Sequence, residues 1–322
     1  GMRAAVTMKP TRIAGHDLAS GSVILRVGQN GDDLHEAVRE AASRFGLELL
    51  AVDTGLAEWG YPSLGSTEVM PVKTPRIALL AGFPVHGYSF GWAWYTLDQQ
   101  YQIPITVRRV RSLAATPIHD FNVLVIPNTF AAEQLAQQLG EGGVQRLQQW
   151  VRDGGSLVAI GNSVDFVRQN LEMSGLRSWY EEEEKKGDSG GQESVDDAEP
   201  RRFSVPGAMV RVELDKETWM SAGYEADLPA LVDSSRIFLE PQGPPDSGRR
   251  VVGRYGKGDY LAIAGYLWPE SRERLSGAVF AYEERIGRGR VILFAEDPNF
   301  RGYWRGADRL FLNAVVLSPS AP

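Results

Sequence analysis

The sequence predicts an α/β fold: a doubly wound, mostly parallel, flavodoxin-like sheet with a β-rich extension, preceded by a small N-terminal α+β segment. Three observations predict it. Short continuous apolar runs, typical of strands buried on both faces, recur after residue 76. Helical patterns separate these runs. Residues 154–163 hold one complete unit, in which a Gly-Gly turn leads into an apolar strand, an elbow at Gly161 and a new helix.

Composition limits the classes of function. The chain has 322 residues, 43% of them hydrophobic and 23% charged, as is ordinary for a globular protein. A net charge of −7 argues against a nucleic-acid partner, which needs a clustered basic face. The absence of cysteine excludes disulfides, thiolate metal sites and a cysteine nucleophile. No apolar run approaches the roughly 18 residues of a membrane span, so we expect no transmembrane segment.

Residues 1–73 are predicted to form a connecting segment. A short strand is expected at 22–27 and an amphipathic helix at 33–45, with Leu34 and Val38 on its apolar face. The run 55–75 is rich in Gly, Pro and Ser, and is interpreted as a linker. A domain boundary is therefore placed between residues 73 and 74.

Residues 74–322 are predicted to form the main domain. Parallel strands are expected at 77–80, 103–110, 122–126, 157–160 and 289–294. Helices are expected at 88–101, in a stretch that ends at 153, after residue 163 and at 308–317. Further strand-like pieces, at 209–214, 250–255, 260–265 and 279–286, predict an antiparallel extension of the sheet or a β-rich lobe beside it.

An acidic insertion is expected at about 177–203. It begins with four glutamates and two lysines at 181–186 and continues as a run rich in Gly, Ser and Asp. Such a run buries almost nothing, so a mobile, solvated surface insertion is favoured over a site for a metal or a basic partner.

The elbow Gly161-Asn162-Ser163 stands where several hydrolase families place a nucleophile. Ser163 needs a base within hydrogen-bond reach to attack at neutral pH. His86 follows the first parallel strand and is the candidate base, provided that the first and fourth strands are neighbours. The alternative is that Ser163 caps the following helix. The four histidines are scattered singly, so we expect no metal site.

Polar residues follow several strand ends, where doubly wound sheets bind their ligands. The cluster after the last buried strand is interpreted either as a site for a small anion or zwitterion or as an arginine–carboxylate network that fixes the loop before the last helix. Its members are Glu296, Asp297, Asn299, Arg301, Tyr303 and Arg305. The candidate ligand-binding residues are His86, Asn128, Asn162, Ser163, Asp297, Asn299, Arg301, Tyr303 and Arg305.

Aromatic residues are dense at 88–101. Phe90, Trp92, Trp94 and Tyr95 are expected to fill the core, with the lining of a sugar or peptide cleft as the alternative.

Four runs resemble a known module: 76–83, 88–99 (YSFGWAWYTLDQ), 154–161 (GGSLVAIG) and 297–306 (DPNFRGYWRG). The module is the C-terminal class I glutamine amidotransferase-like domain that follows the catalytic domain in bacterial zinc carboxypeptidases, relatives of carboxypeptidase A. The resemblance covers about residues 74–318, and the run 297–306 is its most specific part.

The resemblance implies a pseudoenzyme. The family's cysteine would fall at Gly161 or Asn162, and its His-Pro-Glu at Asp297-Pro298-Asn299, so these triad positions are vacant and no glutaminase activity is expected. The implied function is that of a non-catalytic accessory domain, which packs on the peptidase domain of the same polypeptide, binds a peptide or cell-wall ligand, or forms a homo-oligomer. Zinc would belong to that peptidase domain alone, this chain would hold no cofactor, and the protein would be secreted or periplasmic. A ligand-binding sensor at the strand-end cleft is the remaining alternative.

Overall fold

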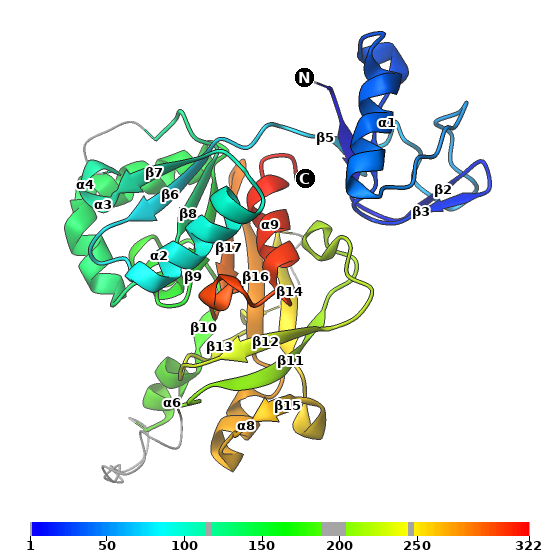
Figure 1. The fold of residues 1–322 in the computed structure, drawn as a ribbon. Helices are drawn as coiled ribbons and strands as arrows, with labels where there is room; N and C mark the ends of the chain where they lie inside the picture. Colours follow the sequence, from blue (N-terminus) through cyan, green and yellow to red (C-terminus); the bar gives the residue numbers. More distant parts are fainter. Residues whose placement is uncertain (1, 114–117, 188–203, 244–247, 322) are drawn as a thin grey trace.

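A long mixed sheet runs through the protein (Figure 1). The computed structural model describes residues 2–113, 118–187, 204–243 and 248–321. Half of the sheet is parallel, in the spatial order β7-β6-β8-β9-β17. The bounds of these strands are Ile105–Arg109 (β7), Ile77–Ala81 (β6), Val123–Ile126 (β8), Ser156–Ile160 (β9) and Gly289–Phe294 (β17). The predicted α/β class is confirmed.

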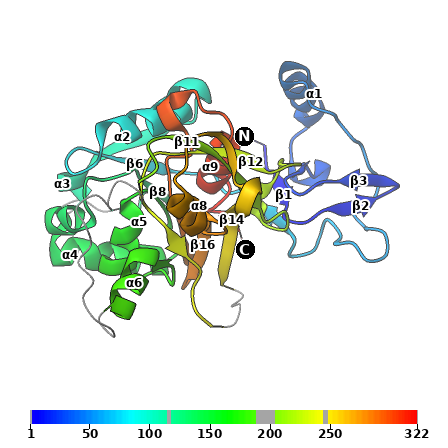
Figure 2. The same ribbon diagram turned by 90° about the horizontal axis from the view of Figure 1, so that it is seen from below.

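Helices cover both faces of the parallel half. Side chains alternate across each strand, so an apolar strand needs cover on both faces. Leu79 of β6 packs in one hydrophobic cluster and Leu80 in another. The first cluster lies under α2 (Gly87–Trp94) and α9 (Asp308–Val316). Figure 2 shows the ribbon from below, with both helices labelled. The second cluster lies under α3, α4 and α5. Their bounds are Val110–Leu113 (α3), Ala132–Arg152 (α4) and Ser163–Asp165 (α5). Each fully buried Leu or Ile contributes about 1.5–3 kcal/mol.

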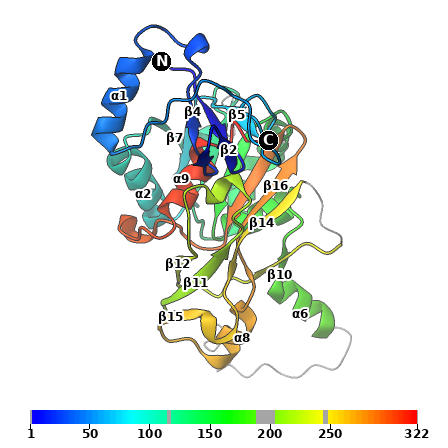
Figure 3. The ribbon, with the colours of Figure 1, turned by 90° about the vertical axis from the view of Figure 1, so that its right-hand side faces the viewer.

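The other half of the sheet is antiparallel and begins where β16 (Val279–Ile286) pairs with β17. Beyond β16 the order continues through β14, β11 and β12, so the predicted antiparallel extension is confirmed. Figure 3 shows this half reaching down to β15 and α8. The bounds are Ala208–Leu214 (β11), Leu228–Val232 (β12), Phe238–Leu239 (β13), Arg249–Tyr255 (β14), Ala262–Gly265 (β15) and Pro269–Leu275 (α8).

The N-terminal segment forms a small α+β unit beside the main sheet (Figure 1). The predicted helix is α1 (Leu34–Phe45), whereas the predicted strand at 22–27 is confined to β4 (Val23–Ile24). The run interpreted as a linker contains β5 (Val69–Pro71), which pairs with β1 (Ala5–Thr7). The sequence did not indicate this strand, because a strand this short is specified by its partner and not by its own pattern. A hairpin of β2 (Thr11–Ile13) and β3 (His16–Leu18) completes the unit.

Two predicted elements differ in form. The helix at 88–101 is α2 followed by a π-helical turn, Tyr95–Gln100. The first part of the acidic insertion is ordered as β10 (Arg177–Ser178) and α6 (Trp179–Gly187). Glu181 pairs there with Arg168, so these charges are engaged. Residues 188–203 lie outside the described part of the chain. Among the described helices, none is long and apolar enough to cross a membrane.

Candidate functional site

The loops after β6 and β8 meet at the carboxyl ends of these neighbouring strands. Backbone hydrogen bonds join them: His86 N donates to Asn128 O at 2.8 Å, and Phe130 N donates to Pro84 O at 3.0 Å. An isolated β-bridge between Val85 and Thr129 lies between these two bonds. The two loops therefore form one fixed platform, since hydrogen bonds on both sides restrict their backbones.

Ser89 connects this platform to the end of β17. The Ser89 side chain is buried on α2, where its Oγ accepts from Asn128 N at 2.9 Å. The same Oγ donates to Asp297 Oδ1 at 2.5 Å. One hydroxyl thus links the ends of three parallel strands, and it uses both its donor and an acceptor position.

The elbow after β9 packs closely against Asn128. Gly161 has φ +61°, and a Cβ at this position would lie 2.5 Å from Asn128 Oδ1, so glycine is required on both counts. Asn162 N donates to the same Oδ1 at 2.9 Å, and Asn162 Nδ2 donates to Thr129 O at 2.8 Å. The elbow is held by these contacts.

Ser163 does not meet a base. Its side chain is fully buried and its Oγ donates to Pro127 O at 2.6 Å. Strand β8 lies between β6 and β9, so the first and fourth strands are not neighbours as the hydrolase hypothesis requires. The His86 ring lies instead against the rings of Phe130 and Tyr88, at 5.2 and 5.5 Å. The geometry supplies neither an activated hydroxyl nor a side-chain helix cap.

Arg236 reaches this edge of the sheet from the loop between β12 and β13. Its guanidinium donates to Glu296 Oε2 at 2.8 Å, to Ala295 O at 2.9 Å and to Asn162 Oδ1 at 3.1 Å. Glu296 also accepts from Ser234 Oγ and is 1% exposed. This part of the predicted cluster is an arginine–carboxylate network.

Two adjacent carboxyl groups here have raised pKa values. Burial raises the pKa of Glu296 to about 7, against the opposing effects of Arg236 and Ser234. Burial likewise raises the pKa of Asp297 to about 6, while its hydrogen bond from Ser89 and the charge of Arg236 act in the opposite direction.

The remaining predicted residues of the last loop lie apart from this group. Asn299 is buried and donates to Thr96 Oγ1 at 3.2 Å. Arg301 has φ +55° and is exposed over the Phe300 ring. Tyr303 is exposed against Trp304, and Arg305 donates to Asp308 at 3.2 Å. The structure thus brings together His86, Asn128, Asn162, Ser163 and Asp297, and separates Asn299, Arg301, Tyr303 and Arg305 from them.

Three polar groups on this platform have hydrogen-bonding capacity to spare. None of the hydrogen bonds among the described residues uses the His86 ring nitrogens, Asn128 Nδ2 or Asp297 Oδ2. All three residues are partly exposed. Together they offer an imidazole, an amide donor and a carboxylate acceptor to a molecule in solution.

Six rings follow one another in contact across this surface, and we name them the aromatic row. Neighbouring ring centroids lie 4.8–6.4 Å apart. Of the predicted core aromatics, Phe90 and Trp94 pack on the core, whereas Tyr95 is exposed. The members of the row, in order, are Phe83, Phe130, His86, Tyr88, Trp92 and Phe300.

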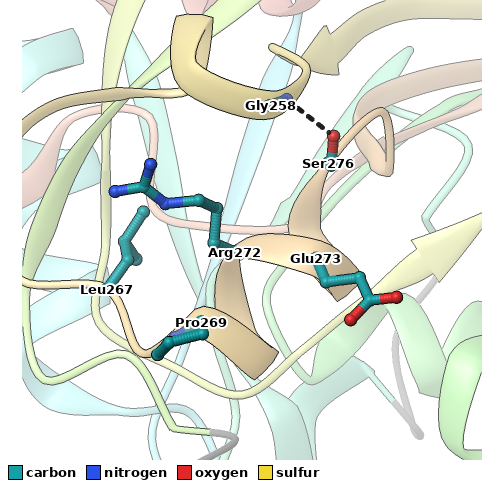
Figure 4. Close-up of a pocket in the computed structure, with 6 residues that line it drawn as sticks. All are labelled: Gly258, Leu267, Pro269, Arg272, Glu273 and Ser276. Carbon is teal, nitrogen blue, oxygen red and sulfur yellow. Dashed lines mark hydrogen bonds between the residues drawn. The ribbon is translucent and has the colours of Figure 1, made fainter.

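Two hollows of the surface lie apart from this platform. One, of about 510 Å³, lies beside α8 and is lined by Leu267, which precedes the helix, and by Pro269, Arg272 and Glu273 on it (Figure 4). A second is lined by residues 2–5 and 71–74 together with Ile24, Arg26 and Gln29. Neither contains a predicted site residue. Among the described residues, no group of His, Asp or Glu is placed to hold a metal ion.

Sequence reasoning missed three participants. Ser89 and Phe130 directly adjoin predicted elements, and their position beside strand ends was a usable signal. Arg236 had no such signal, because it lies 60 residues before Glu296 in a different half of the sheet. Only the tertiary fold brings it to this site.

Comparisons with known proteins give no family. No protein-family model matches the chain, and no curated protein does. A ThuA-like protein from Parabacteroides merdae resembles it with a TM-score of 0.46 and 12% identity, over 77% of this chain and 90% of that one. A β-galactosidase from Bacillus circulans sp. alkalophilus has a TM-score of 0.43 and 13% identity, over 78% of this chain and 31% of that one. An exo-β-1,4-mannosidase from an Opitutaceae bacterium has a TM-score of 0.39 and 14% identity, over 75% of this chain and 34% of that one. The chain thus spans about a third of the length of each of these two enzymes.

These findings correct the predicted family. The similar structures are β-galactosidases, a mannosidase and ThuA-like proteins, and not accessory domains of zinc carboxypeptidases or glutamine amidotransferases. The predicted membership, and the function of a carboxypeptidase accessory domain, were wrong. The interpretation of Gly161, Asn162, Asp297 and Asn299 as vacant triad positions depended on that membership and falls with it.

Proposed function

We propose that this chain binds a small polar ligand at the carboxyl ends of β6, β8 and β17. His86, Asn128 and Asp297 are the residues that contact it. The observation that carries the proposal is the set of unused hydrogen-bonding groups that these three residues present on one rigid platform.

The strand order supports this position. Numbered along the chain, the parallel strands lie in the order 2-1-3-4-5, which we interpret as a flavodoxin-like sheet. In that arrangement the chain leaves the first strand toward one edge and later returns on its other side. Ligands of such sheets bind outside the carboxyl ends at this switch point, which here lies between β6 and β8. His86 and Asn128 lie on these two loops.

The chemistry of the platform favours an uncharged polar ligand. The Asp297 carboxylate disfavours an anion, and the guanidinium of Arg236 is already engaged by Glu296. An apolar ligand would leave the second oxygen of the Asp297 carboxylate, Oδ2, without water or a partner, at a cost of about 1–3 kcal/mol. A ligand that donates to Asp297 and accepts from Asn128 meets both groups at once.

The proposal is tested by thermal-shift titration of the protein with monosaccharides, polyols, nucleosides and amino acids. We expect at least one uncharged class to raise the melting temperature, since a ligand that binds only the folded state stabilises it. Asp297→Ala should abolish this shift. Trp59→Ala, at a fully exposed aromatic residue of the N-terminal unit, is the matched control and should keep it.

A shift that persists in Asp297→Ala would place the ligand elsewhere and overturn the proposal. So would a wild-type protein that no compound in the panel stabilises. Direct titration calorimetry on the same variants separates lost binding from an altered starting stability.

A further inference from the structure

The aromatic row extends on both sides of the polar platform. On one side of His86 lie Phe130 and Phe83, which are 57% and 56% exposed. On the other side lies Tyr88, which is 71% exposed and stacks on Trp92 with an interplanar angle of 12°. Large aromatic side chains that remain exposed in contact with one another mark a binding surface more often than isolated ones do.

The extent of the row exceeds what a single small ligand needs. A molecule that contacts Asp297 and Asn128 meets the centre of the row, at His86, and leaves the rings on either side uncovered. A chain of repeating units would cover them. Each unit would need an apolar face for a ring and polar groups for the platform.

Three classes of chain molecule can be compared. A nucleic acid has stacking faces, but its phosphates would meet the Asp297 carboxylate on a protein of net charge −7. An extended peptide gains much of its affinity by pairing with a free strand edge. The row lies on loops and α2 instead, while the edge strands of the main sheet path are β7 and β12. A saccharide has C–H faces for the rings, and hydroxyls that both donate and accept.

We propose, building on the proposed function, that the ligand is a linear, uncharged oligosaccharide that lies along the aromatic row. Its central unit donates hydroxyl hydrogen bonds to Asp297 and accepts one from Asn128. Units on either side stack on Tyr88 and on the pair Phe83 and Phe130.

The experiment measures affinity against chain length. Wild-type protein is titrated calorimetrically with β-1,4-linked glucose, mannose, galactose and N-acetylglucosamine oligomers of one to six units. Phe83→Ala, Tyr88→Ala, Asp297→Ala and the control Trp59→Ala are titrated in parallel. Phe83 and Tyr88 are exposed, so their replacement should leave folding unchanged, and circular dichroism checks this.

In at least one series we expect the dissociation constant to fall by about tenfold or more from the monomer to the tetramer. Phe83→Ala and Tyr88→Ala should remove this gain and keep the affinity for the monomer. Asp297→Ala should weaken every length, and Trp59→Ala should change none.

The outcomes separate the two proposals. Monomer binding that depends on Asp297 but does not improve with length overturns the oligosaccharide and leaves the proposed function standing. Tighter binding of a proline-rich peptide than of every oligomer overturns it as well. Monomer binding that is unchanged in Asp297→Ala overturns both proposals. Both are also overturned if no saccharide binds and no compound of the thermal-shift panel raises the melting temperature.

Discussion

Strand β17 has a buried arginine–glutamate pair at each of its ends, and the two pairs have different surroundings. At the amino end, Arg290 pairs with Glu283 of β16 and donates to Ala321 O at 2.6 Å. Trp219 covers the pair and donates to Glu283 at 3.0 Å. At the carboxyl end, Arg236 pairs with Glu296.

The difference lies in the neighbouring groups. Around Arg290 the described neighbours cover the pair and supply further hydrogen bonds, and the aromatic residue among them, Trp219, is itself buried. Beside Glu296, Asp297 keeps an unused oxygen and lies next to the platform that the aromatic row crosses. A network that is closed by the protein itself indicates a structural role. A network with unused groups at a strand-end surface indicates binding.

The largest effect should come from the amino end. Glu283→Ala leaves the Arg290 guanidinium buried without its carboxylate, which should cost about 3–5 kcal/mol of unfolding free energy. Urea denaturation at pH 7.5 measures this loss. The double variant Glu283→Ala/Arg290→Met should recover much of it, because no charge is then left buried. A single-variant loss below about 1 kcal/mol would contradict a closed structural network.

A smaller effect is expected at the carboxyl end. Arg236→Met also removes one partner of a buried pair, but Glu296, whose pKa is already raised to about 7, can take up a proton. The loss should be about 1–3 kcal/mol at pH 6.5. It should grow above pH 7, because the variant raises the Glu296 pKa further and ionisation then becomes the dominant cost. Urea titrations at pH 6.5 and 8.5 test this, and a loss that is equal at both would refute it.

The sequence located the parallel strands and the polar residues at their ends because both signals are local. The apolar run before Gly161 specifies a buried strand, and the residue types after it specify a turn. Strand ends that belong to one parallel sheet meet at one edge, which placed Asn128 near Asp297. This reasoning needs no knowledge of distant contacts.

What the sequence could not supply depends on contacts between distant segments. The order of the strands in the sheet cannot be read from local sequence. His86 was therefore considered as a base for Ser163, although β8 separates β6 from β9. Arg236 arrives from the antiparallel half, and strand β5 exists only through pairing with β1. The family prediction also failed, since short runs such as 297–306 do not determine a family without a match along the whole chain.

The smallest expected effect is a pH-dependent gain in unfolding free energy when Asp297 is replaced by asparagine. Burial raises the pKa of its carboxyl in the folded protein to about 6, whereas its ordinary value is 3.8. The folded state therefore binds more protons than the unfolded state between these values, and wild-type stability falls as pH rises from about 4 to about 6. Asp297→Asn removes this slope while its side-chain oxygen can still accept from Ser89. The variant should equal wild type near pH 4 and be about 1 kcal/mol more stable above pH 6.5, allowing for the partial exposure of the carboxyl.

Chemical denaturation at pH 4.2, 5.5 and 7 measures this gain, with the exposed Asp32→Asn as control. Glu296 gives wild type and Asp297→Asn the same slope of stability against pH, so its contribution cancels in the difference between them. Loss of ligand binding in a variant that is more stable than wild type at neutral pH would show that Asp297 is kept for recognition at a cost in stability, in contrast to the pair at the amino end of β17. A gain that is equal at all three pH values would instead assign the effect to packing and remove this distinction between the two ends of the strand.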